Sequence, residues 1–221
     1  LVGSEMCIRD RRMKCSSGSQ HLLKISGLRA IKQMDTKGSG AVSQWRTIMS
    51  EGFRNLQQRC GCNPDGQFGP NTAKGIMKHY EMSPERAAHF LGQVCIESMN
   101  FQAVEENLNY SVDALMKVFG RYFKTRADAK PYSKNPRALA NYVYMDKNRS
   151  EKSKLGNISD NDGWIFRGRG FLQITGRANV RKFASDMRLP EVMDEPQLIA
   201  SHYPMESALW YFNKRRGLWK I

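Results

Sequence analysis

The sequence lacks three features that would place the protein in a familiar class. No apolar stretch approaches the length of about 20 residues that crosses a bilayer, so stable membrane insertion is not expected. No basic start leads into a continuous apolar segment with a small-residue cleavage site, so we expect no secretory leader. The five cysteines are an odd number, and Cys60 and Cys62 lie too close in sequence for an easy bridge. These absences predict a reduced protein made in a cytoplasm.

Acidic residues are also scarce, since 35 Lys and Arg face 21 Asp and Glu and leave a formal charge of +14. Such an excess predicts an anionic partner, which can be nucleic acid, a membrane surface or the acidic polymers of a bacterial envelope. The aromatic residues recur mainly at core spacing rather than along a basic stripe, so no nucleic-acid partner is expected. A chain of 221 residues can bury one good core, which predicts one catalytic domain with a small appendage.

The first 82 residues divide into two segments. Residues 1–48 lack a starting Met and a sustained apolar period, and we interpret them as disordered or as non-native sequence upstream of Met49. Residues 49–82 contain Asp65-Gly66, which suits a tight turn, then Phe68 and Gly69-Pro70, which suits a helix start. This run resembles about half of the small helical peptidoglycan-binding module. We interpret it as a helical lead-in that packs on the catalytic domain of residues 83–221.

Two glutamates nine positions apart are the candidate catalytic acid and base. A helix is predicted from Ser83-Pro84 onward, and Glu97 falls at its C-terminal end on the apolar face. Both placements should raise the pKa of Glu97. Glu106 follows in a run of polar residues that should keep it ionised, provided that residues 98–100 break the helix and fold the chain back. A protonated acid facing an ionised base is the arrangement that glycoside hydrolysis uses. The alternative is that both are solvated surface glutamates, the commoner fate of such residues.

Further helices are predicted after Ser111 and Asn135-Pro136, and an apolar helical run at Met205–Phe212, with a long polar loop at Asp146–Gly163. Residues 162–179 are rich in glycine and arginine, without the Lys-Ser/Thr of a nucleotide-binding loop. Within them, Phe171–Thr175 alternates like a short strand, which would place Gln173 and Thr175 on one face. An amide and a hydroxyl on that face could bind a sugar and a water.

These runs together resemble the family 19 glycoside hydrolases, and the compact phage endolysins of that family more than its plant chitinases. The matched positions are Phe90–Gln93, Glu97–Ser98, Phe101, Glu105–Ser111, Phe119–Phe123, Asn135–Pro136, Ala140–Tyr144, Gly163–Trp164, Arg167–Gly170, Gln173–Gly176, Asn179 and Ser207–Trp210.

The resemblance implies a site and a mechanism. Glu97 takes the place of the family's general acid, and Glu106 that of the base that activates water, with Glu105 open as an alternative. Thr175 corresponds to the hydroxyl that holds the water. Gln173 and Asn179 correspond to the substrate-binding amides, and Tyr110 and Arg169 are further expected substrate contacts.

The family also implies a mainly α, lysozyme-like α+β fold with a short β element, and an inverting reaction that uses no metal or cofactor. The chain lacks the Thr-x-x-Ile-Asn-Gly-Gly segment with which the family continues, so we expect a domain truncated at its C-terminus. The expected protein is a monomeric endolysin. It would be made in a host bacterial cytoplasm, act on the wall after release, and cut the β-1,4 bonds of peptidoglycan.

Two alternatives remain open. The first is a chitinase acting on chitin-like polymers. The second is a catalytically silent glycan-binding protein, because Ile96 replaces the His that usually precedes the acid, and Met99-Asn100 replaces a Gly-Gly pair.

Overall fold

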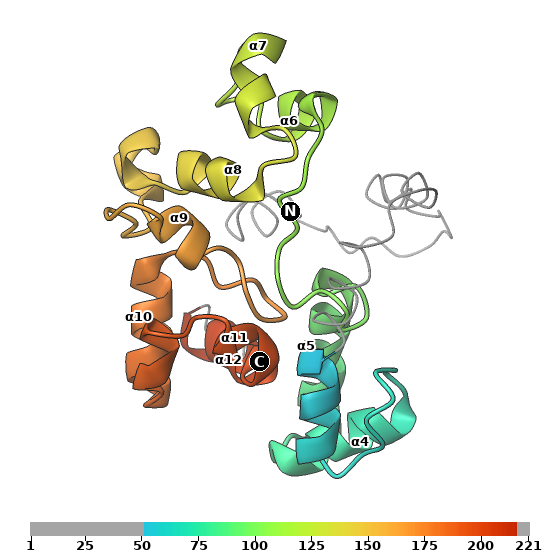
Figure 1. Ribbon diagram of the computed structural model, residues 1–221. Helices are drawn as coiled ribbons and strands as arrows, with labels where there is room; N and C mark the ends of the chain where they lie inside the picture. Colours follow the sequence, from blue (N-terminus) through green and yellow to red (C-terminus); the bar gives the residue numbers. More distant parts are fainter. Residues whose placement is uncertain (1–50, 216–221) are drawn as a thin grey trace, which may run out of the picture.

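Helices form most of the regular structure in residues 51–215, the part of the chain that the computed structural model describes (Figure 1). The mainly α fold class is therefore confirmed. Segment 1–48 and residues 216–221 lie outside the described residues. In the described range, none of the helices has both the length and the apolar character needed to cross a bilayer.

The elements follow one another along the chain in this order. After a helical stretch at residues 51–59 come α4 (Pro70–His79), α5 (Pro84–Glu97), α6 (Val112–Val118), α7 (Arg126–Ala129), η1 (Lys130–Tyr132), α8 (Pro136–Val143), η2 (Asp146–Asn148), η3 (Glu151–Ser153), α9 (Asp162–Ile165), α10 (Arg177–Met187), η4 (Pro190–Met193), α11 (Leu198–Ser201), α12 (Pro204–Trp210) and η5 (Tyr211–Arg215).

Side-chain caps set the starts of four helices, and three of these were predicted from the sequence. The side chains of Ser83, Ser111 and Asn135 each accept a hydrogen bond from the backbone N–H three residues further on, at the starts of α5, α6 and α8. Each cap satisfies one of the N–H groups that a helix start leaves without an internal partner. The helix starts predicted from these residues are therefore confirmed.

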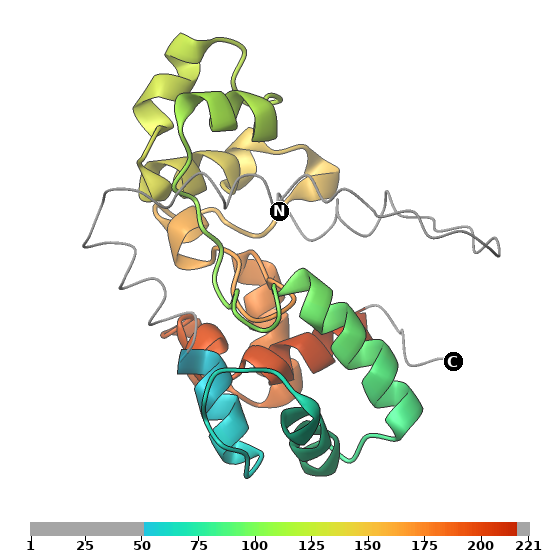
Figure 2. The same ribbon diagram turned by 90° about the vertical axis from the view of Figure 1, so that its right-hand side faces the viewer.

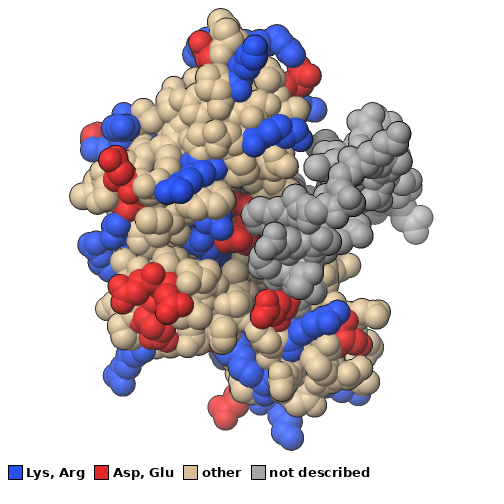
Figure 3. Space-filling model, in the orientation of Figure 1, with Lys and Arg blue, Asp and Glu red and all other residues tan. Residues whose placement is uncertain are grey.

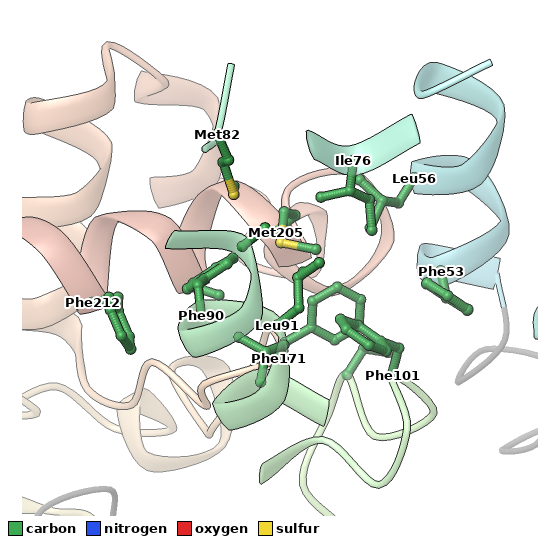
Figure 4. Close-up of a cluster of buried hydrophobic side chains, with 14 of the residues drawn as sticks. Phe53, Leu56, Ile76, Met82, Phe90, Leu91, Phe101, Phe171, Met205 and Phe212 are labelled. Atoms are coloured by element: carbon green, nitrogen blue, oxygen red, sulfur yellow. The ribbon is translucent and has the colours of Figure 1, made fainter. Parts of the chain in front are cut away.

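A first hydrophobic core, which we call the lower core, joins the lead-in to the rest of the fold (Figure 4). Phe101 lies at its centre, with its ring centroid 5.1 Å from that of Phe53, 4.4 Å from that of Phe68 and 5.1 Å from that of Phe171. Phe53 and Phe68 belong to the lead-in, so residues 51–82 share one core with residues that follow α5.

Two further cores complete the fold. The upper core lies around α6, α7 and α8, and the third core around α10, η4 and α12. An extended segment at residues 102–111 runs from the lower core to the upper one (Figures 1 and 2). It leaves the lower core at Val104 and enters the upper core at Leu108, so Glu105 and Glu106 lie between the two.

The predicted strand at Phe171–Thr175 is wrong. The chain turns there, because the N–H of Gln173 donates to the carbonyl of Gly170 (3.0 Å) and Gln173 has a φ of +52°. In the described residues, β pairing is limited to two isolated bridges, one between Glu105 and Arg169 and one between Arg169 and Ile174. These bridges fix the register of three chain segments without forming a sheet.

Candidate active site

Glu97 is the last residue of α5, and the chain reverses direction directly after it. The buried hydroxyl of Ser98 donates to the carbonyl of Val94 (2.6 Å) and accepts from the N–H of Phe101 (3.0 Å). Met99, Asn100 and Phe101 then have φ angles of +52°, +58° and +64°. The predicted break of the helix at residues 98–100 is confirmed.

This reversal is strained, because left-handed backbone costs a residue with a Cβ roughly 1–2 kcal/mol. Glycine would adopt this conformation freely, whereas this chain places Met99 and Asn100 there. Burial of Phe101 among the rings of the lower core opposes the strain, since a buried Phe contributes roughly 1.5–3 kcal/mol. The core therefore holds the turn that follows Glu97.

Glu106 is bound on both carboxylate oxygens. The hydroxyl of Tyr144 donates to Oε2 (2.7 Å), and the N–H of Gly168 donates to Oε1 (2.6 Å). Burial raises the pKa of Glu106 above its ordinary value of 4.5, while these two hydrogen bonds and the charges of Arg167 and Arg169 act against that rise. Burial therefore acts against the ionised form that the sequence predicts for Glu106, because the polar residues beside it in sequence are not its neighbours in space.

Gly168 is the point at which the predicted site residues meet. A Cβ placed on it would lie 2.7 Å from Gln173 Oε1, 3.2 Å from Thr175 Oγ1 and 3.3 Å from Glu106 Oε1. No side chain fits at this position unless these groups move. Because only a hydrogen stands there, a carboxylate, an amide oxygen and a hydroxyl converge on one small volume.

Hydrogen bonds hold the amide and the hydroxyl in place. The Gln173 amide donates to the carbonyl of Gly170 (2.9 Å), which leaves its Oε1 directed at Gly168. The Thr175 hydroxyl donates to the carbonyl of Gln173 (3.1 Å), and the Asn179 amide donates to the carbonyl of Thr175 (2.8 Å). Asn179 thus fixes the backbone beside Thr175.

Glu105 has a different environment from Glu106. Its carboxylate pairs with Arg167 (2.6 Å) and Arg169 (2.8 Å), and its side chain is 8% exposed. Arg169 is itself buried and also donates to the carbonyl of Ile165. Nε and Nη1 of Arg169 therefore hold chain segments together, and its expected contact with substrate stays a prediction.

Two tyrosines complete the surroundings of Glu106. Tyr110 is half-buried with its ring against Phe119 (5.4 Å between centroids), and burial together with the charge of Glu106 raises the pKa of its hydroxyl. Tyr144 is 3% exposed and was assigned no role from sequence. The place of Tyr144 in the run Ala140–Tyr144, directly after a helix, was the sequence feature that could have drawn attention to it. Its contact with Glu106, however, comes only from the fold.

Glu97 stands apart from this cluster. It is half-buried and accepts a hydrogen bond from the Gln93 amide (3.0 Å). No hydrogen bond or ion pair within residues 51–215 joins it to Glu106. In the space-filling view, acidic and basic side chains lie next to each other in a recess between the upper and lower parts of the molecule (Figure 3). Across the described residues, no three His, Cys, Asp or Glu side chains gather into a group that could hold a metal ion.

Comparison with known proteins gives one informative match. No protein-family model matches the chain. The chain is 34% identical over 153 residues to a protein of Haemophilus influenzae named "Glycosyl hydrolase family 19 domain-containing protein". The aligned region covers 65% of this chain and 72% of that protein.

Proposed function

Because the chain belongs to glycosyl hydrolase family 19, we propose that it is a phage-type endolysin that hydrolyses β-1,4-glycosidic bonds in bacterial peptidoglycan. Family membership implies a glycan substrate, and the choice of peptidoglycan is our own. The observation that supports hydrolysis best is the convergence of the Glu106 carboxylate, the Gln173 amide oxygen and the Thr175 hydroxyl around Gly168. Such a set can hold a water molecule and take a proton from it.

In the proposed reaction, Glu97 donates a proton to the leaving oxygen of the glycosidic bond. Glu106 removes a proton from a water that Thr175 and Gln173 hold, and this water attacks the opposite face of the sugar. An inverting enzyme needs its two carboxyl groups roughly 6.5–9.5 Å apart so that a water fits between base and sugar. Glu97 and Glu106 share no hydrogen bond, which agrees with a separation of this kind.

Glu106 suits the role of base better than Glu105 does. Two arginines neutralise Glu105, whereas Glu106 faces the hydroxyl and the amide that would hold the water. Burial raises the pKa of Glu106, and a base with a higher pKa takes a proton more readily as long as it is ionised at the working pH.

The charge distribution favours peptidoglycan over chitin, which is uncharged. Residues 112–137 carry seven exposed basic side chains, which we call the basic region: Lys117, Arg121, Lys124, Arg126, Lys130, Lys134 and Arg137. The two acidic residues of this range are Asp113, which pairs with Arg126, and Asp128, which bonds to the N–H of Thr125 within a helix cap. Lys and Arg side chains are spread over the upper part of the molecule in Figure 3. Such a region attracts the carboxylates of peptidoglycan stem peptides, and salt should weaken the attraction.

The test is digestion of purified peptidoglycan and of chitin oligomers, with mass analysis of the products and NMR detection of the first anomer released. We expect muropeptides with the inverted anomer. Glu106→Gln should lower the rate about 10²–10⁴-fold, because it removes the general base. The matched control is Glu151→Gln, which removes an exposed carboxylate that pairs with Lys154.

Other outcomes would identify the alternatives. Cleavage of chitin oligomers alone would indicate a chitinase. Wall binding without new reducing ends would indicate a silent glycan-binding protein, which the exposed Ile96 beside the acid gives reason to consider. An undiminished rate in Glu106→Gln would refute its role as base.

A further inference from the structure

A buried group of three charged side chains lies directly behind Glu106 and has no part in the proposed reaction. We call Glu105, Arg167 and Arg169 the buried clamp, with side chains 8%, 10% and 6% exposed. Glu105 Oε1 lies 2.6 Å from Arg167 Nη2 and 2.8 Å from Arg169 Nε. One carboxylate thus serves two guanidinium groups, and the clamp carries a net positive charge.

The clamp connects the segment that carries Glu106 to the turn that carries Gly168. Arg167 donates to the carbonyl of Trp164 (2.9 Å) with its guanidinium 3.7 Å from the centroid of the Trp164 ring, and Arg169 donates to the carbonyl of Ile165. Between the two segments, the N–H of Glu106 donates to the carbonyl of Gly168 (3.1 Å). The ion pairs and the backbone hydrogen bond therefore fix the same alignment of the Glu105–Glu106 segment against the turn that carries Gly168.

That alignment determines which way each glutamate faces. Successive side chains of an extended segment point to opposite sides. Glu105 accordingly meets the arginines, while Glu106 meets Tyr144 and Gly168. Arg167 is incompletely satisfied even so, because its Nε is the one buried side-chain N or O atom in the described residues without a hydrogen-bond partner.

We propose that Glu105 is a positioning residue, which keeps Arg167 and Arg169 from pairing with Glu106 and so leaves Glu106 directed at the water-holding groups. The importance of Glu105 for catalysis rests on the function proposed above, whereas its effect on Glu106 does not. Without the Glu105 carboxylate, two buried guanidinium groups would have Glu106 as their nearby anion. Because a buried unpaired charge is costly, Arg167 and Arg169 would then pair with Glu106.

The expected consequence is a change in the acidity of Glu106. The ionisable groups that influence it are Tyr144 and Tyr110 on one side and Arg167 and Arg169 on the other. Arginine charges already lower the pKa of Glu106 against the effect of burial. Releasing them from Glu105 should lower the pKa of Glu106 by about one further unit, since a nearby opposite charge typically lowers a carboxyl pKa by about 1–3 units.

The experiment is a pH titration of the Glu106 carboxyl by carbon-13 NMR in the full chain, with the signal assigned by its loss in Glu106→Gln. In Glu105→Gln the pKa of Glu106 should fall by about one unit, and the acidic limb of kcat/KM on peptidoglycan should move down by the same amount. The maximal kcat/KM should fall about tenfold or more, because an ion pair with arginine turns the base away from the water. Glu151→Gln should leave all three quantities unchanged.

Two more variants separate electrostatics from structural damage. Combining Glu105→Gln with Arg167→Gln restores the net charge of the clamp, so the pKa of Glu106 should return toward the wild-type value. Arg167→Gln alone should raise the pKa of Glu106, and it reports the same coupling if Glu105→Gln does not fold. An unchanged pKa in folded Glu105→Gln, or no rise in Arg167→Gln, would overturn the proposal. If the pKa values shift as expected but the wild type cuts no glycan, only the proposed function fails.

Discussion

Replacing Tyr144 by Phe isolates a single hydrogen bond to the proposed base. Tyr144 is 3% exposed and its hydroxyl lies 2.7 Å from Glu106 Oε2, so Phe keeps the ring in place and removes only the donor. A hydrogen bond to a charged group contributes roughly 1.5–3 kcal/mol. One pKa unit corresponds to about 1.36 kcal/mol, so the pKa of Glu106 should rise by about 1–2 units.

The sign follows from the proposed role of Glu106 as the base. The base must be ionised, and the Tyr144 bond favours the ionised form, so its loss raises a pKa that burial has already raised. Activity would then be lost at a higher pH, and the acidic limb of kcat/KM on peptidoglycan should move up by about 1–2 pH units. Tyr122→Phe is the matched control, because that hydroxyl donates to the Val143 carbonyl (3.0 Å) instead. An unmoved acidic limb in a folded Tyr144→Phe protein would show that Glu106 does not set this limb.

Two further predictions concern stability. Met99→Gly should stabilise the protein by about 1 kcal/mol, and raise Tm by about 2–4 °C, because Gly removes left-handed strain at a position where the side chain is 48% exposed and packs little; a lower Tm would contradict the strain. Glu106→Gln should be more stable than the wild type near pH 7. With a folded-state pKa above its ordinary 4.5, Glu106 contributes its full stability below about pH 4.5 and loses it as pH rises through the raised pKa, whereas Gln has no proton to lose. Thermal melts across pH should show the difference between the two proteins shrinking in acid, and a constant difference would argue against the raised pKa.

Local chemistry made much of the fold predictable. The caps at Ser83, Ser111 and Asn135 act through bonds three residues away, so the sequence alone identifies them. The break after Glu97 was predictable for another reason. A helix continued to residue 106 would have placed the two carboxylates on opposite sides.

What could not be predicted depends on contacts between distant segments. Glu106 looks solvated in sequence, yet Tyr144 and Gly168, 38 and 62 positions away, donate hydrogen bonds to its carboxylate. The alternation in Phe171–Thr175 was misleading because the lower core takes Phe171 and the third core takes Ile174, and a turn with left-handed Gln173 reconciles the two. The predicted proximity of Gln173 to Thr175 is nevertheless observed, since in the turn both side chains face Gly168.

The aromatic packing around Phe101 has a practical consequence for anyone who shortens this chain. In sequence, residues 51–82 resemble only part of a small module that precedes the helices of the candidate site, so they look dispensable. Yet Phe53 and Phe68 hold the ring that keeps the bend behind Glu97 closed. Cutting at residue 83 would take away that support and loosen Glu97, the proposed proton donor, from a distance, without altering any of the residues proposed to take part in the reaction.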